Sequence, residues 1–156
     1  MQTLRFKIVA GFVSGAMAAT VFHQGMYAVL SASRVTMSGT PWNLALAPNG
    51  IPILVNQMFW SGLWGVVYAF LVDHIPGGRS WLKGLMFGLA FPMFLGSWLI
   101  FAWAKHQPIF AGLLIDGDLM RLRQSIVLAG VSFGIGLGLI YETLMVFKSP
   151  RSKQAA

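Results

Sequence analysis

The sequence predicts an all-α protein, a four-helix transmembrane bundle with glycine-rich contacts between its helices. Three observations predict this fold. Hydrophobic residues make up 56% of the 156 residues and charged residues only 10%, whereas soluble domains average roughly 45–50% and about 25%. Four apolar stretches each reach the roughly 20 residues that a helix needs to cross a bilayer. None of them shows the period-two alternation that a β-barrel requires.

The four apolar stretches cover about residues 6–31, 53–72, 81–104 and 125–147. Each is interpreted as a helix, because backbone groups inside lipid must be hydrogen-bonded within the chain. Segments rich in Ser, Gly, Asn, Pro or charged residues separate them. Residues 1–147 therefore form one transmembrane domain, and 148–156 is expected to be a disordered basic tail. Segment 105–124 is half apolar and fits either a short interfacial helix or an early start of the fourth helix.

The net charge of +7 is explained by membrane topology. Lys and Arg flank the apolar stretches, and seven of the eleven lie on the side of the N-terminus if the chain crosses four times. Because positive residues are enriched in cytoplasmic loops, both termini are expected in the cytoplasm. No basic stripe interleaves with exposed aromatic residues, so the lipid bilayer and not nucleic acid is the expected partner.

Small residues at a spacing of four form stripes on three of the predicted helices. These stripes contain Gly11 and Gly15, then Gly84 and Gly88, then Gly130, Gly134 and Gly138. Spacing four keeps residues on one helix face, and glycine there lets two helix backbones approach closely. We expect these faces to pack within the bundle, with a homo-oligomer contact as the alternative. Continued by four, two stripes reach His23 and Glu142, which should then face other helices.

Polar side chains on the outer side predict a candidate pocket. His23 and Gln24 lie towards the outer half of the first helix, and the second helix begins at a similar height. The expected pocket residues are His23, Gln24, Tyr27, Asn56, Gln57, Trp60 and His106. A ligand or proton site and a hydrogen-bonded helix contact both remain open. No pair of ligand residues has clear metal-site spacing within one helix, so no metal is expected.

Ionisable residues on the inner side predict a second cluster. Its expected members are Glu142, Asp73, His74, Arg79 and Lys83. Glu142 lies about one and a half turns from the end of its helix, and cations lie on the same side. A structural ion pair and a proton- or substrate-binding carboxylate are both open, since an ionisable group within a membrane segment is a functional hypothesis.

Catalytic signatures are missing from the sequence. There is no cysteine, which excludes disulfides and thiolate chemistry. There is also no G-x-S-x-G, H-E-x-x-H, P-loop or strand-linked G-x-G-x-x-G motif. The glycine-rich run GIGLG at 134–138 lies in the middle of an apolar stretch and is interpreted as packing. The sequence therefore marks no catalytic residue and no cofactor.

Two motifs resemble a family of small multipass bacterial inner-membrane proteins. The first is F-H-Q-G at 22–25, which closes the first helix after a basic N-terminus. The second is F-W-x-G-L-W-G at 59–65 in the second helix. The similarity covers roughly the first 90 residues, and the later half is similar only in hydropathy and glycine content. It implies a fold and a bacterial inner-membrane location but no activity, and it links His23, Gln24 and Trp60 in one outer-side cluster.

Three classes of function fit these observations. The first is a non-enzymatic accessory or assembly component beside a larger membrane complex, which suits the small size and the glycine faces. The second is a small transporter or channel, as an oligomer or alone, with His23 and Glu142 on its path. The third is a membrane-embedded enzyme acting on lipid or quinone with His, Asp or Glu as acid or base. The accessory role is the leading hypothesis.

Overall fold

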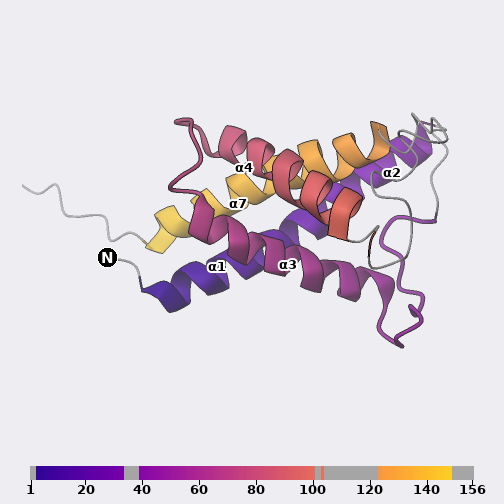
Figure 1. The fold of residues 1–156 in the computed structure, drawn as a ribbon. Helices are drawn as coiled ribbons and strands as arrows, with labels where there is room; N and C mark the ends of the chain where they lie inside the picture. Colours follow the sequence, from indigo (N-terminus) through magenta and orange to yellow (C-terminus); the bar gives the residue numbers. More distant parts are fainter. Residues whose placement is uncertain (1–2, 34–38, 101–102, 104–122, 149–156) are drawn as a thin grey trace, which may run out of the picture.

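The computed structural model of the protein describes residues 3–33, 39–100, 103 and 123–148 (Figure 1). Four long helices make up its fold, and each is long and apolar enough to cross a membrane. The first helix comprises α1 (Leu4–Met17), the π-helical segment η1 (Ala18–His23) and α2 (Gln24–Ala32), and the second helix is α3 (Ile53–Leu71). The third helix comprises α4 (Ser80–Gly88) and the π-helical segment η2 (Leu89–Ile100). The fourth helix comprises the π-helical segment η3 (Ile126–Ser132) and α7 (Phe133–Lys148). The predicted four-helix all-α fold is confirmed.

The predicted helix boundaries agree closely with the structure. The candidate spans are Leu4–Ala32, Ile53–Leu71, Ser80–Ile100 and Arg123–Phe147. The first helix thus starts two residues before its predicted start. Most of segment 105–124 and the tail after 148 lie outside the described residues, so the predictions made for them stay predictions.

Loop 39–52 is held to the start of α3 by two backbone hydrogen bonds of 3.0 Å. The N–H of Ile53 donates to the Ala45 carbonyl, and the N–H of Leu54 donates to the Asn43 carbonyl.

Helices α1 and α3 pack backbone against backbone (Figure 1). A Cβ atom added to Gly11 would lie 2.5 Å from the carbonyl oxygen of Gly65, and one added to Gly15 would overlap the carbonyl of Ser61. Real Cβ atoms do not approach so closely, so both positions require glycine. The α3 side of this contact is formed by Ser61, Gly62 and Gly65.

A second backbone contact joins the third helix to the fourth. A Cβ atom on Gly134 would lie 2.5 Å from the Gly84 carbonyl oxygen, and Cβ atoms on Gly84 and Gly88 would overlap carbonyls of the fourth helix. At the start of α4, Gly138 meets the carbonyl of Ser80, the first residue of that helix. The glycine stripes therefore pack inside the bundle, in two separate helix pairs.

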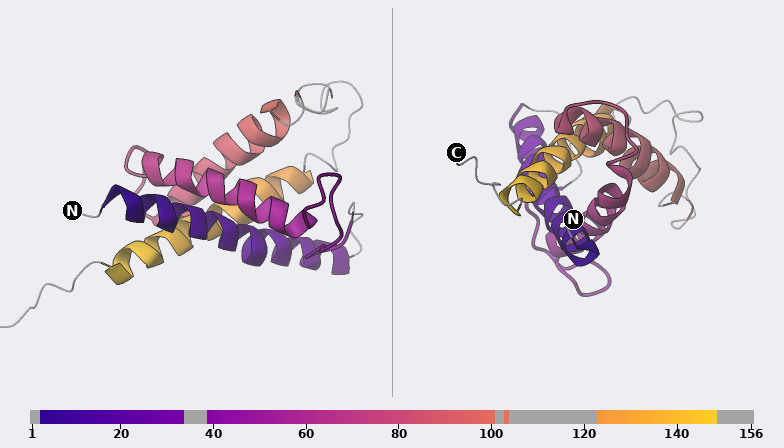
Figure 2. Two further views of the ribbon diagram at one scale, coloured as in Figure 1. Left: turned by 90° about the horizontal axis from the view of Figure 1, so that it is seen from below. Right: turned by 90° about the vertical axis from the view of Figure 1, so that its left-hand side faces the viewer.

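The two pairs join through the first and fourth helices. The ring of Phe22 in η1 lies against Gly136, where an added Cβ would come within 2.8 Å of the Phe22 Cβ. Ala18, Ala19 and Leu137 are fully buried at this contact. Helices α3 and η2 stand on the outside of their pairs, and η2 leans away from α3 (Figure 2, left). This geometry places an opening between α3 and η2.

The lean of η2 is associated with a proline. Pro92 lies inside η2, where it has no N–H to donate and where a proline interrupts the regular helix. The Ser97 hydroxyl, five residues further on, donates to the Pro92 carbonyl at 3.1 Å. The hydroxyl thereby adds a donor to the Pro92 carbonyl, whereas the missing Pro92 N–H affects a carbonyl one turn earlier.

The glycine contacts generate a stability prediction with an internal control. Gly15→Ala should lower the free energy of unfolding by about 1–3 kcal/mol, because the added methyl group overlaps the α3 backbone. Gly25→Ala lies in the same long helix, has nothing within 4 Å of its added Cβ, and should be neutral or slightly stabilising. Unfolding of both variants in detergent micelles measures the difference. Equal stability of the two variants would contradict the close packing.

Candidate functional site

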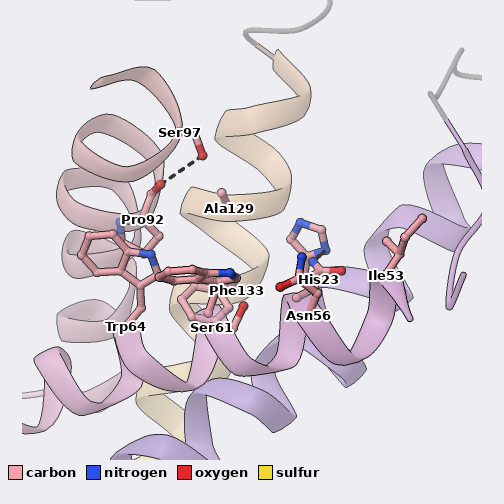
Figure 3. A pocket seen from close by; sticks show the side chains of 11 residues that line it. His23, Ile53, Asn56, Ser61, Trp64, Pro92, Ser97, Ala129 and Phe133 are labelled. Carbon is pink, nitrogen blue, oxygen red and sulfur yellow. Dashed lines mark hydrogen bonds between the residues drawn. The ribbon is translucent and has the colours of Figure 1, made fainter. Parts of the chain in front are cut away.

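An open cleft of about 350 Å³ lies between α3 and η2. Figure 3 shows His23 and Asn56 at one end of it and Trp64 and Pro92 at the other. Its wall is formed by His23 from η1, by Ile53, Asn56, Gln57, Trp60, Ser61 and Trp64 from α3, by Pro92 and Ser97 from η2, and by Ala129 and Phe133 from the fourth helix. None of these lining side chains carries a fixed charge. The cleft is mostly apolar and aromatic, with His23, Asn56 and Gln57 at one end and Ser97 beside Pro92 at the other.

Three hydrogen bonds connect loop 39–52 to His23. The backbone N–H of Trp42 donates to Gln24 Oε1 at 2.8 Å. Gln24 Nε2 donates to Gln57 Oε1 at 2.6 Å, and Gln57 Nε2 lies 3.0 Å from His23 Nδ1. This chain of hydrogen bonds links the first helix to the second and ends at the His23 imidazole in the cleft wall.

The direction of this chain follows from its first member. A backbone N–H can only donate, so the Gln24 atom that meets Trp42 must be its carbonyl oxygen. Gln24 then offers its amide NH₂ to Gln57, and Gln57 in turn offers its own NH₂ to His23. Nδ1 of His23 is thereby an acceptor, which puts the proton of the neutral imidazole on Nε2. The orientation of each glutamine amide group therefore follows from the hydrogen-bond partner that precedes it.

Trp42, the first donor of the hydrogen-bond chain, is held in a strained backbone conformation. Its φ of 49° lies in the left-handed region, which non-glycine residues rarely adopt. Its indole N–H donates to the Thr20 carbonyl in η1 at 2.9 Å. Two bonds from one residue thus fasten the loop to the first helix. Strain of this kind is retained where the surrounding contacts over-determine the backbone.

Three polar groups in the cleft wall have no partner within the described part of the chain. They are His23 Nε2, the Asn56 amide and the Ser61 hydroxyl. The cleft therefore offers an N–H donor, a carboxamide that both donates and accepts, and a hydroxyl, all beside aromatic rings. An apolar pocket with a few converging polar groups is typical of a small-molecule site.

The structure divides the predicted outer pocket into two. His23, Asn56, Gln57 and Trp60 line the cleft. Gln24 and Tyr27 line a second recess of about 310 Å³, which faces residues 39–43 of the loop and shares only His23, Ile53 and Gln57 with the cleft. His106 lies outside the described residues.

The predicted inner cluster is partly brought together. Asp73, Lys83 and Glu142 line a pocket of about 230 Å³, the inner pocket, together with Tyr68 and Tyr141. His74 and Arg79 are exposed and do not line it. Asp73 pairs with Lys7 at 3.1 Å, and Lys83 Nζ donates to the Val72 carbonyl at 3.0 Å.

Glu142 lines the inner pocket together with residues of α3 and α4, but its side chain is exposed. The glycine stripe of the fourth helix ends opposite Ser80, where α4 begins. Glu142 lies one turn beyond that point, so its side chain is exposed even though Lys83 of α4 lines the same pocket. Within the described residues Glu142 forms no ion pair.

Aromatic packing separates the cleft from the inner pocket. The two cavities share no lining residue. Phe87, which is 1% exposed, packs edge-on against Trp64 of the cleft at 6.4 Å and against Tyr68 of the inner pocket at 5.1 Å between ring centroids. His23 and Glu142 therefore belong to different sites.

Sequence reasoning missed seven residues of the cleft wall and also Trp42 behind it; the seven are Ile53, Ser61, Trp64, Pro92, Ser97, Ala129 and Phe133. Ser61 and Trp64 lie within the F-W-x-G-L-W-G motif, so that motif was the available signal. Ser97 and Phe133 line the cleft because η2 leans outward, which no pattern indicated. Trp42 is not marked by any motif, yet its backbone N–H begins the hydrogen-bond chain.

The chain has no significant match among known protein families, curated proteins or solved structures. The resemblance carried by the two motifs therefore stays a prediction.

The hydrogen-bond chain predicts the tautomer of His23. In ¹⁵N NMR spectra of labelled protein, Nδ1 of His23 should resonate as an unprotonated nitrogen and Nε2 as a protonated one. Gln57→Leu removes the donor to Nδ1 and should abolish this fixed tautomer, at a cost of roughly 1–3 kcal/mol in stability because buried amide bonds are lost. The exposed His74 provides a reference in the same spectrum. A protonated Nδ1 in the unaltered protein would contradict the hydrogen-bond direction inferred for Gln57 and His23.

Proposed function

We propose that the protein is a non-enzymatic accessory component of the bacterial inner membrane that holds an uncharged amphipathic molecule in the cleft between α3 and η2. The observation that carries this proposal is the combination of an aromatic wall with the directed Nε2–H of His23. That imidazole is held with its N–H donor towards the cleft, where it can recognise a hydrogen-bond acceptor on a bound molecule. Transport and lipid or quinone chemistry, the other hypotheses, find no comparable support in the geometry.

The shape of the cleft supports a lipid-soluble ligand. Its volume of about 350 Å³ lies in the roughly 300–1,000 Å³ range of small-molecule sites. Trp60 is 47% exposed at the wall, so part of the ligand would remain in contact with the surrounding lipid. A molecule dissolved in the bilayer can enter from the side without crossing water.

The polar end of the cleft supports an uncharged head group on the ligand. None of the described lining side chains carries a fixed charge, and a charged group would be costly to hold in that environment. His23 Nε2–H and the Ser61 hydroxyl can donate to a carbonyl or hydroxyl oxygen, and the Asn56 amide can both donate and accept. Trp60 and Trp64 offer flat faces that favour a ring or an unsaturated chain.

A larger membrane complex is the proposed partner. The glycine faces are occupied within the bundle, so a partner would have to use another surface. Phe59 and Trp60, which are 50% and 47% exposed, form an aromatic edge beside the cleft. A partner seated there would receive the bound molecule directly.

Blocking the cleft tests the binding function. Ala129→Trp places a large ring in the cleft wall, whereas Val29→Trp adds the same ring to a side chain that is 58% exposed on the outer surface. Protein purified from its native membrane in mild detergent should carry a small amphipathic molecule, detected by mass spectrometry of solvent extracts. Ala129→Trp should lose it and Val29→Trp should keep it. An extract without such a molecule from the unaltered protein, or equal retention by the two variants, would contradict the proposal.

The proposed topology places both termini in the cytoplasm, and the excess of Lys and Arg on that side supports it. The cysteine-free chain allows a direct test. A membrane-impermeant maleimide applied to spheroplasts should label Asn49→Cys, while His74→Cys should react only after the membrane is opened. Both positions are exposed. The reverse pattern would invert the proposed orientation.

A further inference from the structure

The inner pocket lies at the opposite end of α3 from the loop and His23, where α3 ends and α4 begins. It is lined by residues of α3, of the turn, of α4 and of α7. Its volume of about 230 Å³ far exceeds the roughly 10–15 Å³ that a single water requires. The pocket is therefore large enough for a polar head group.

Two tyrosine hydroxyls in the pocket wall lack partners. Tyr68 is 0% and Tyr141 is 4% exposed, and their rings meet edge to face at 5.5 Å between centroids. Both hydroxyl oxygens are buried without a hydrogen bond to any residue in the described ranges. Leaving a buried hydroxyl unpaired costs free energy, so two neighbouring cases in one pocket wall point to a ligand that supplies the partners.

The pocket also presents charges of both signs. An ammonium group has three N–H donors, and Lys83 uses one on the Val72 carbonyl at 3.0 Å, which leaves two. Asp73 is engaged by Lys7, whereas Glu142 has no ion-pair partner among the described residues. The first turn of α4 begins at the pocket without a side-chain cap, and uncapped N–H groups at a helix start favour an anion.

We propose that the inner pocket binds the head group of a zwitterionic phospholipid that carries a phosphodiester and a primary ammonium. The phosphate accepts from Lys83, from the tyrosine hydroxyls and from the start of α4, and the ammonium meets Glu142. A purely anionic head group would face the Glu142 carboxylate, and a purely cationic one would face Lys83. Only a group with both charges satisfies both side chains.

The depth of the pocket fits a lipid head group. Glu142 lies six residues before the end of α7 at Lys148, which is roughly 9 Å at about 1.5 Å per residue. The pocket therefore lies near the end of the candidate membrane span Arg123–Phe147, where a lipid head group would be found. This proposal does not depend on the cleft, because the two cavities share no lining residue.

Native mass spectrometry of the full chain tests the proposal with three lipids of identical acyl chains. Phosphatidylethanolamine carries both groups, phosphatidylcholine has no ammonium N–H, and phosphatidylglycerol has no cation. Phosphatidylethanolamine should bind about tenfold more tightly than either of the others, as expected for one added charge-assisted hydrogen bond. Equal binding of the three lipids would overturn the proposal. Complete displacement of the lipid by inorganic phosphate would also overturn it, by showing a general anion site.

Two charge variants with a matched control locate the binding. Glu142→Gln should reduce phosphatidylethanolamine binding to the level of phosphatidylglycerol. Lys83→Gln should weaken all three lipids. Arg79→Gln removes the same charge from an exposed residue that does not line the pocket, and it should change nothing. An effect of Arg79→Gln as large as that of Lys83→Gln would overturn the assignment, because it would reveal a general surface attraction.

Tyrosine variants separate ligand binding from folding. Tyr68→Phe removes an unpartnered hydroxyl, so the thermal stability of the lipid-free protein in detergent should not fall. Its affinity for phosphatidylethanolamine should fall severalfold, since a hydrogen bond to the phosphate is lost. A loss of stability in lipid-free detergent with unchanged affinity would mean that the hydroxyl is structural, and would overturn its role. Retention of the cleft ligand by these variants distinguishes a failure here from a failure of the proposed function.

Discussion

Direct backbone contact between glycine-bearing helix faces is the constraint on which the rest of this structure depends. In lipid, helices gain little from hydrophobic association, so close van der Waals approach must hold them together. Gly11 and Gly15 provide it against α3, and Gly84 and Gly88 provide it against the fourth helix. Each contact joins a pair, and the pairs then meet through the first and fourth helices. Between α3 and η2 the described residues form no such backbone contact, and the cleft lies between these two segments.

The polar groups are arranged around this division. The hydrogen-bond chain from Trp42 through Gln24 and Gln57 lies across the first pair, whose backbones the glycines hold at a fixed separation. It ends on His23 at the edge of the cleft, so the imidazole orientation depends on the same close packing. At the other end of the bundle the second pair stops at Ser80 and Gly138. The inner pocket lies at that stop, where both residues line it together with the buried tyrosines and the charged side chains.

Much of the fold was predictable because it depends on local properties of the sequence. The lengths of the apolar stretches predict the four helices, and glycines at a spacing of four predict which helix faces pack together. The partner face on α3 was not found, because Gly62 and Gly65 have a spacing of three. The exposure of Glu142 was not predicted, because extending a stripe ignores where the opposing helix begins. A stripe predicts a contact only as far as its partner extends.

The candidate site was less predictable for a physical reason. His23, Asn56, Gln57 and Trp60 could be found because polar and aromatic residues near the outer end of apolar helices are conspicuous. Trp42 could not, since its role depends on a left-handed backbone angle and on how the loop returns to η1. Ser97 and Phe133 reach the cleft because the helix changes direction near Pro92. Such features depend on long-range geometry that no local pattern encodes.

The measurement that tests the central claim most directly is the distance between helices in lipid, by electron spin resonance of paired spin labels. The cysteine-free chain allows pairs at exposed positions: Val9 with Val67 and Met86 with Leu139 within the two glycine-bound pairs, and Val55 with Ile100 across the cleft. The account predicts narrow distance distributions within each pair, unchanged between detergent and lipid, and a broader one across the cleft. A narrow distribution across the cleft combined with broad ones within the pairs would contradict it.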